Sequence, residues 1–255
     1  MLSYRHQYHA GSAADVLKHA VLAFAVEHLQ RKETPAFFLD THAGAGLYRL
    51  DAPEARKTGE AEEGIRRVLA AAGGGGAKPR ALPDLLVPWL DVVRAARREE
   101  GDVVPGSAAI LARRLRPQDR AVLEELHPTD HRLLATRFAR DRRILVVRED
   151  AARIPSRHLP PPERRGLVIV DPSYELAGDV EATAALVALA ARRFPTGVLV
   201  LWYPVIERPA TEAFLSGLAG AGLRKAFRIE LCPRPDAPGR GMTGSGLLVV
   251  NPPFT

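Results

Sequence analysis

The sequence predicts an α/β fold built on a mostly parallel sheet of seven strands, with helices on both faces. Short runs rich in valine, isoleucine and leucine alternate with helical patterns through the second half of the chain. Most of these runs are apolar on both faces, as expected for parallel strands that are covered on both sides. The chain has 255 residues, of which 46% are hydrophobic and 26% charged, so it can bury one large core and is neither disordered nor fibrous. We therefore expect a single domain over residues 1–255.

The first half of the chain predicts a helix, a buried strand and a helical insertion. The run AFFLD at residues 36–40 predicts a buried strand that leads into a glycine-rich turn. Residues from about 52 to 117 show helical patches, a run of glycines from Gly73 to Gly76 and no convincing strand. They predict a helical insertion with a flexible loop. The helix is predicted over residues 13–30, as an amphipathic helix with Ser12 as its N-cap and with Val16, Leu17, Ala20, Val21, Phe24 and Leu29 at helical spacing.

Strands and helices alternate regularly in the second half. Four strands are predicted at residues 121–126, 143–147, 166–171 and 197–203, with helices at 131–140 and 180–193 between them. A further helix, at about 209–220, precedes two runs at 225–231 and 246–251 that predict a closing pair of strands. This order favours strands joined by helical crossovers.

Charge and cysteine content point to a basic protein of a reducing compartment. Lys and Arg exceed Asp and Glu by 6, which favours a polyanionic partner, with nucleic acid as the first candidate. Cys232 is the single cysteine, so we expect neither an internal disulfide nor, because no Cys/His set has suitable spacing, a metal site. The apolar stretch at residues 20–26 is too short to span a membrane. We expect a cytoplasmic protein with no membrane partner.

Four predicted strands end in polar residues, and ligands of open α/β sheets bind beyond the carboxyl ends of the strands. The first end is the turn Asp40-Thr41-His42-Ala43-Gly44-Ala45-Gly46. Its glycines would let the backbone approach a nucleotide-type cofactor closely. An ordinary turn with positive φ explains the same glycines, and Arg49 stands where an NAD-binding fingerprint needs its third glycine.

Carboxylates stand at the next two strand ends. Glu125 of the pair Glu124-Glu125 could accept hydrogen bonds from both hydroxyls of a ribose. It lies 85 residues after Asp40, far beyond the spacing of a dinucleotide fold, and a solvated acidic pair is the alternative interpretation. Asp150 follows the strand at 143–147, where its carboxylate could accept a hydrogen bond from an adenine amino group.

The fourth end, Asp171-Pro172-Ser173-Tyr174, follows an entirely apolar strand. A half-buried carboxylate costs free energy unless it is paired, so stability alone does not explain it. The group suits a flat base that carries an amine, because Tyr174 offers a stacking face while Asp171 and the Pro172 carbonyl accept hydrogen bonds from the amine. Asp171 could also take up the proton that the amine releases.

A second candidate for this motif stands at the end of the chain, in Asn251-Pro252-Pro253-Phe254. If the last strand is antiparallel, this tetrapeptide lies at the opposite edge of the sheet from the other polar strand ends. We interpret it as a chain-ending turn.

The motifs together resemble a known family. The blocks LSYRHxYHAGxxADVLKH, LDTHAGAGxY, TGE, PGS, ELHPxD, DPSY, LWYP and GMTxSGxxVxNPP cover nearly the whole chain. They are similar to the class I S-adenosylmethionine-dependent amino-methyltransferases with a Rossmann-like sheet, and among these to the bacterial 23S ribosomal RNA adenine-N6 methyltransferases. Two positions depart from the pattern, since Ser173 replaces the usual second proline and Ala151 follows Asp150 in place of a glycine.

The resemblance implies roles for individual residues. Asp171 would be the catalytic acceptor, with Pro172 beside it and Tyr174 as the stacking ring. Residues 1–12 would form an N-terminal tail that contacts the substrate. Substrate RNA would be contacted at the mouth of the pocket by Tyr4 and His6 of this tail and by Lys18, which follows it. The implied S-adenosylmethionine-binding residues are His19, His42, Gly44, Gly46, Ser107, Glu125, Asp150 and Asp171.

The residues of the tail also carry their own argument for RNA. This segment has no apolar pattern but carries aromatic rings and hydrogen-bond donors, on Tyr4, His6, Tyr8, His9 and Lys18. Such a mixture suits an unstacked RNA base and its phosphates. A disordered start of the chain is the alternative. The leading hypothesis is an S-adenosylmethionine-dependent enzyme, expected as a monomer, that methylates N6 of one adenine in 23S RNA, either naked or in an early assembly intermediate. A DNA adenine methyltransferase and a non-catalytic RNA-binding assembly factor are the alternatives.

Overall fold

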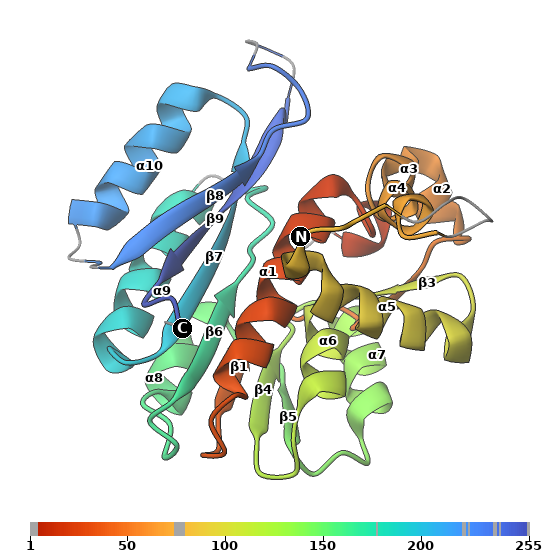
Figure 1. Cartoon of the computed structure of the whole chain (residues 1–255). Coiled ribbons are helices and arrows are strands. Elements are labelled where there is room, and N and C mark those ends of the chain that lie inside the picture. The colour runs from red at the N-terminus through yellow and green to blue at the C-terminus, as the bar shows by residue number, and fades with distance from the viewer. Residues whose placement is uncertain are drawn as a thin grey trace.

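The computed structural model describes residues 5–73, 80–176, 178–220, 223, 225–236, 239 and 241–253. Its centre is a seven-stranded sheet in the order β5-β4-β1-β6-β7-β9-β8 (Figure 1). The strands are β1 (Phe37–Asp40), β4 (Arg120–Glu124), β5 (Ile144–Val147), β6 (Gly166–Val170), β7 (Val198–Val205), β8 (Ala226–Leu231) and β9 (Gly244–Val250). Each lies where the sequence predicts a strand.

The sheet is parallel except for one strand. β1 pairs in parallel with both β4 and β6, so the direction in which successive strands are added reverses at β1. β9 runs antiparallel to β7 and to β8, which confirms the predicted closing pair. Asn251 therefore follows β9 at the amino-terminal end of β7, and its side-chain amide donates to the carbonyls of Pro195 and Gly197. The Asn251 turn is thus at the far edge of the sheet from the other polar strand ends.

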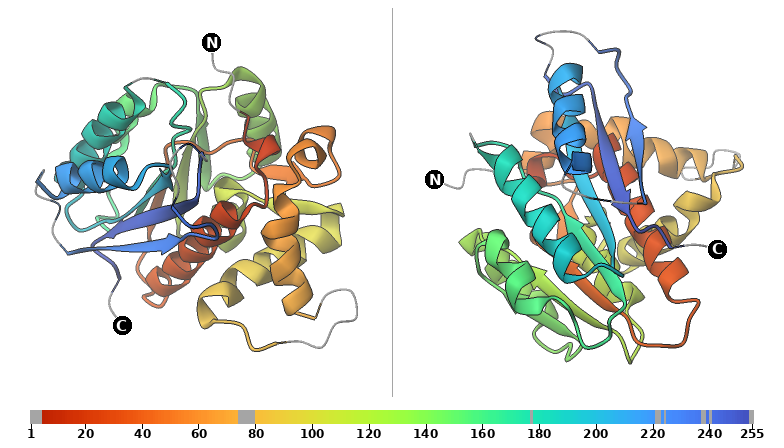
Figure 2. Two further views of the ribbon diagram at one scale, coloured as in Figure 1. Left: turned by 90° about the horizontal axis from the view of Figure 1, so that it is seen from above. Right: turned by 90° about the vertical axis from the view of Figure 1, so that its left-hand side faces the viewer.

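Helices cover both faces of the sheet, as predicted (Figures 1 and 2). Neighbouring residues of β1 show the division, because Phe38 packs into the core that includes α1 and α6, whereas Phe37 packs into the core on the other face. On the first face lie α1 (Ala13–Leu29), α5 (Val87–Glu100), α6 (Ser107–Arg114) and α7 (Pro128–Phe138); on the second lie α8 (Ile154–His158), α9 (Asp179–Arg193) and α10 (Arg208–Gly220).

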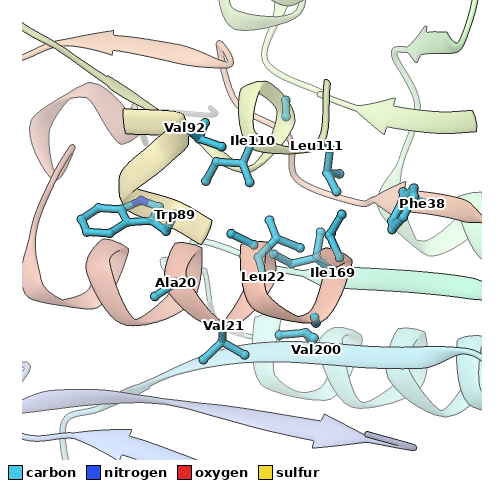
Figure 3. Packing of buried hydrophobic residues seen from close by; sticks show 14 of the residues in the cluster. Ala20, Val21, Leu22, Phe38, Trp89, Val92, Ile110, Leu111, Ile169 and Val200 are labelled. Atoms are coloured by element: carbon cyan, nitrogen blue, oxygen red, sulfur yellow. The ribbon is translucent and has the colours of Figure 1, made fainter. Parts of the chain in front are cut away.

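Helix α1 is buried more completely than its sequence pattern predicts. Ser12 caps it as expected, because its hydroxyl accepts a hydrogen bond from the Asp15 backbone N–H. The expected amphipathic character is wrong, since nearly every side of α1 is buried and Phe24, placed in the apolar row, is 37% exposed. The reason is that other helices cover α1: α5 packs Trp89 against it from outside the layer of helices on the sheet, and α6, which lies beside α1 on the sheet, contributes Ile110 to the same core (Figure 3).

The region predicted as a helical insertion contains a strand that the sequence analysis missed. Its helices are α2 (Pro53–Thr58), α3 (Glu60–Glu63), α4 (Ile65–Ala71), the 3-10 helix η3 (Asp84–Leu86), α5 and α6. β3 (Val103–Pro105) then pairs antiparallel with β2 (Leu47–Arg49) in a separate two-stranded sheet. Strands of three residues are too short to show a periodic pattern. The predicted flexible loop, beyond Gly73, lies outside the described residues.

Candidate active site

A cavity of about 400 Å³ lies at the carboxyl ends of β1, β4 and β6, next to the reversal in strand order. This is the edge at which open α/β sheets bind ligands. Gly46 and Tyr174 do not line the cavity, and Tyr4 lies outside the described residues. The structure brings together ten of the predicted site residues in its wall: His6, Lys18, His19, His42, Gly44, Ser107, Glu125, Asp150, Asp171 and Pro172.

The glycine-rich turn after β1 forms one wall of the cavity. Gly44 has a φ of +61°, a conformation that favours glycine. Its N–H donates to Oε2 of Glu125 at 2.8 Å, and a Cβ at this position would lie 2.0 Å from the Tyr48 hydroxyl. Gly46 has a supporting role, because its carbonyl accepts a hydrogen bond from the N–H of Gly106, just before α6. The turn thus presents bare backbone to the cavity.

Two adjacent glutamates end β4 and differ in their surroundings. Glu125 accepts backbone hydrogen bonds from Gly44 at 2.8 Å and His127 at 2.6 Å, while burial raises its pKa. Glu124 was not expected to be in the site, yet it lines the same cavity and is 1% exposed. Burial, together with the charge of Glu125, raises the pKa of Glu124 to about 9, so this carboxyl is protonated at neutral pH. Its Oε1 atom has no hydrogen-bond partner among the described residues.

Two histidines of the cavity are neutral at physiological pH. Burial lowers the pKa of His19 to about 3 and that of His42 to about 4, although acidic neighbours oppose the change in both. The His42 backbone N–H donates to Asp40 Oδ1 at 3.1 Å, and burial raises the pKa of Asp40 to about 7. Ser107, the first residue of α6, hydrogen bonds to the Asp40 carboxyl and lines the cavity. These neutral rings leave room for a bound cation without charge repulsion.

Asp150 lies across the cavity, after β5. Its Oδ1 accepts a hydrogen bond from the Ala152 N–H at 2.9 Å and so caps the 3-10 helix η4 (Ala151–Arg153). Ala151 and Ala152 also line the cavity. The carboxylate and the small side chains beside it leave space for a flat ring at this position.

The Asp171 motif follows β6, which is the central strand beside β1. Asp171, Pro172 and Ser173 line the cavity. Tyr174 has a φ of +54° and turns its hydroxyl away to donate to the Trp202 carbonyl at 2.9 Å. Its ring packs against the rings of Trp202 and Phe214 at centroid distances of 5.9 and 6.3 Å. The structure therefore places Tyr174 behind the cavity wall, and its role as a stacking ring stays a prediction.

Lys18 occupies a different place from the one expected. It does not lie at the mouth of the pocket, because it is 3% exposed and its ammonium group lies 2.5 Å from Oδ2 of Asp171. The same Nζ atom is 3.1 Å from Oδ1 of Asp15 and 5.8 Å from the centre of the Trp202 ring. The helical position of Lys18 explains this, since α1 is buried on the side that faces the end of β6.

His6 connects the N-terminal segment to the cavity. It lies in the 3-10 helix η1 (His6–Tyr8), lines the cavity, and places its Nε2 atom 2.9 Å from Oδ2 of Asp15. Its ring packs against Tyr48 at 5.0 Å. Gln7 and Tyr8 attach η1 to the rest of the chain through hydrogen bonds with the Arg49 carbonyl and the Thr58 hydroxyl. The described part of this segment is therefore ordered against the insertion.

Comparison with known proteins identifies the family. Residues 33–255 match the family described as "Ribosomal RNA large subunit methyltransferase D, RlmJ". The chain belongs to this family. It is 42% identical over 257 residues to the "Ribosomal RNA large subunit methyltransferase J" of Haemophilus influenzae, covering 100% of this chain and 89% of that protein. The protein of the same name from Escherichia coli K12 is also 42% identical, over 255 residues, with 100% of this chain and 88% of that protein covered.

A solved structure has a similar fold. The crystal structure of a Legionella pneumophila protein has a TM-score of 0.85 and 35% sequence identity, covering 97% of this chain and 88% of that one. The RlmJ-family chain thus has the class I, Rossmann-like methyltransferase fold, and its cofactor is S-adenosylmethionine.

The residues of the cavity fit S-adenosylmethionine. The turn at Gly44 brings backbone into the wall of the cavity, and the neutral His19 and His42 suit a sulfonium cation. Glu125 would hold the ribose and Asp150 the adenine amino group of the cofactor. Among the residues that the structure describes, no group of three acidic, histidine or cysteine side chains could hold a metal ion, and no helix is long and apolar enough to cross a membrane.

Proposed function

We propose that this chain transfers a methyl group from S-adenosylmethionine to the exocyclic N6 of one adenine in 23S ribosomal RNA. The observation that carries the proposal is the position of Asp171, whose carboxylate follows the central strand β6 and lines the cavity together with Pro172. The names of the related proteins support a substrate in the RNA of the large subunit.

The chemistry of an aromatic amine explains why two acceptors are needed. The N6 lone pair is delocalised into the adenine ring, so the amine is a poor nucleophile. The Asp171 carboxylate and the Pro172 carbonyl would each accept one N–H, which holds the nitrogen nearer to tetrahedral geometry and directs its lone pair toward the donor.

The proton balance assigns a further role to Asp171. The bound cofactor supplies an electrophilic methyl group, so that a C–S bond breaks as the N–C bond forms. The nitrogen then carries a surplus proton, and Asp171 is the carboxylate placed to accept it. The Lys18 ammonium, 2.5 Å from Asp171 Oδ2, competes with the amine for this carboxylate.

The substrate must present an unstacked base. A base inside a duplex has to be flipped out before its amine can reach such a cavity, and exposed or single-stranded RNA avoids that cost. His6 at the cavity wall would contact this base, and the net charge of +6 favours the RNA backbone. We propose a cytoplasmic enzyme that acts as a monomer on naked 23S RNA or on an early assembly intermediate.

A substrate comparison tests the proposal. Labelled S-adenosylmethionine is incubated with the enzyme and, separately, with naked 23S transcript, assembled large subunits and duplex DNA that contains the same sequence. The methylated nucleoside is then identified by mass spectrometry. We expect N6-methyladenosine at a single position of the naked transcript, and much less product on the other two substrates. Methyl transfer to duplex DNA alone, or to another atom of the RNA, would contradict the proposal.

A further inference from the structure

A buried ion network surrounds the Asp15 carboxylate, in the first turn of α1. Asp15 is 2% exposed, and both of its oxygens are engaged. Oδ1 lies 3.1 Å from the Lys18 ammonium and 4.0 Å from Nε2 of His19. Oδ2 accepts a hydrogen bond from the Gly11 N–H at 2.9 Å and lies 2.9 Å from Nε2 of His6. Asp15 thus joins the N-terminal segment to the cation that holds Asp171.

We propose that Asp15 is a positioning residue for methyl transfer, because it offers Lys18 a second carboxylate and so allows Asp171 to exchange Lys18 for the amine of the target adenine. This inference rests on the proposed function of Asp171. Asp15 itself acts only through Lys18 and does not contact the reacting atoms.

The geometry around Lys18 supports an exchange of partners. The ammonium lies between two carboxylates, at 2.5 Å from Asp171 and 3.1 Å from Asp15. An amine that donates to Asp171 competes with the ammonium for this carboxylate and so favours its movement toward Asp15. A buried cation without a counter-ion is costly, and Asp15 removes that cost. Asp15 and Lys18 are three residues apart on α1, so the helix itself keeps the two side chains within reach of each other.

Asp15 keeps its negative charge, as this role requires. Burial raises the pKa of its carboxyl, but the neighbouring His6 ring and Lys18 ammonium lower it by more, so the pKa lies well below its usual range. The Asp15 carboxylate is therefore available to Lys18 throughout the neutral pH range.

An alternative role for Asp15 is purely structural, since it also anchors the Gly11 turn and His6. The substitution Asp15→Asn separates the two roles, because the asparagine oxygen still accepts the Gly11 N–H whereas the charge that holds Lys18 is lost. Ser12→Ala is the matched control. It removes the hydroxyl that accepts the Asp15 N–H at 3.3 Å and so loosens the same turn without touching Lys18.

The test is a single-turnover measurement with saturating S-adenosylmethionine and naked 23S transcript. We expect Asp15→Asn to slow methyl transfer by roughly 10- to 100-fold, the effect of losing one charged hydrogen-bond partner. The dissociation constant for S-adenosylhomocysteine should change by less than about threefold, and Ser12→Ala should lower the melting temperature with little change in rate. A wild-type rate in Asp15→Asn, or an equal loss of rate in Ser12→Ala, would overturn the proposal.

A second pair of variants decides the matter if Asp15→Asn does not fold. Removing both members of a buried ion pair is better tolerated than removing one, so Lys18→Met is compared with Lys18→Met/Asp15→Asn. If Asp15 acts through Lys18, the two rates agree within about twofold; a further loss in the double variant would show a separate role. Failure of the proposed function is distinct, because then the wild-type enzyme itself would form no N6-methyladenosine.

Discussion

At the scale of single residues, the site depends on which carboxyls are charged. Asp171 and Asp15 share the Lys18 ammonium, whereas Glu124 is buried with one oxygen unpartnered among the described residues. Most of the polar strand ends were predictable from the sequence, because the carboxyl ends of parallel strands must converge. Glu124, Asp15 and the buried position of Lys18 were not, because the direction and burial of one side chain depend on what the neighbouring layers cover.

Glu124 makes the stability of the protein dependent on pH. Its pKa is about 9 in the folded chain but near 4.5 in the unfolded one, so the folded state binds more protons between these values. The contribution of this group to stability is fully present below about pH 4.5 and is lost as the pH rises toward 9. Glu124→Gln should therefore melt close to the wild type at pH 5 and at least about 2 °C above it at pH 8.

Scanning calorimetry from pH 5 to pH 9 checks this expectation. Glu163→Gln is the control, because the Glu163 carboxylate pairs with Arg120 at 2.6 Å and its pKa is lowered. The control should gain no stability at any pH. If the difference in melting temperature between Glu124→Gln and the wild type stays the same from pH 5 to pH 9, Glu124 is not protonated in the folded protein.

At the scale of elements, the sheet was predictable and the layer outside it was not. The seven main strands have four to eight residues, most of them apolar, and their positions follow from the sequence. β2 and β3 have three residues each and leave no pattern. The all-round burial of α1 arises from α5, a segment distant in sequence, so the local pattern of α1 contains no sign of it. For the turn after β1, the local sequence predicts both the backbone conformation and the position in the site.

The turn at Gly44 provides the test at this scale. Gly44 and Gly59 have similar φ values, +61° and +66°, but a Cβ on Gly44 would strike the Tyr48 hydroxyl whereas one on Gly59 would meet nothing within 4 Å. Both alanine variants should lose about 1 kcal/mol of stability from backbone strain, and Gly44→Ala should lose more because the Tyr48 hydroxyl must shift. Only Gly44→Ala should also weaken S-adenosylhomocysteine binding, by at least about tenfold as measured by calorimetry. Equal affinities in the two variants would show that the turn does not cradle the cofactor.

At the scale of the whole molecule, the protein combines an excess of positive charge with one cavity beside the topological switch point. The net charge of +6 acts on a polyanion over the whole surface, whereas the proposed function assigns the choice of base and the binding of the cofactor to the cavity. The positive charge can be predicted from the amino-acid composition alone. The cavity cannot, because Lys18, Glu125 and Asp171 are far apart in sequence and come together only when β1, β4 and β6 lie side by side.

Salt separates the two kinds of binding. We expect the affinity for a 23S RNA fragment to fall at least about tenfold between 50 and 200 mM salt, because bound basic side chains release counterions from the phosphates. The affinity for S-adenosylhomocysteine should stay nearly constant over the same range. Fluorescence anisotropy for the RNA and calorimetry for the cofactor product measure both. An RNA affinity that is insensitive to salt would contradict an electrostatic contribution from the surface.

The most direct measurement is the methyl-transfer rate of Asp171→Asn beside its affinity for S-adenosylhomocysteine. The substitution keeps the shape of the side chain but removes the proton acceptor. With naked 23S transcript, the rate should fall at least about 100-fold, while the affinity for the cofactor product falls by at most about tenfold. A variant that forms N6-methyladenosine at the wild-type rate would contradict the account of Asp171.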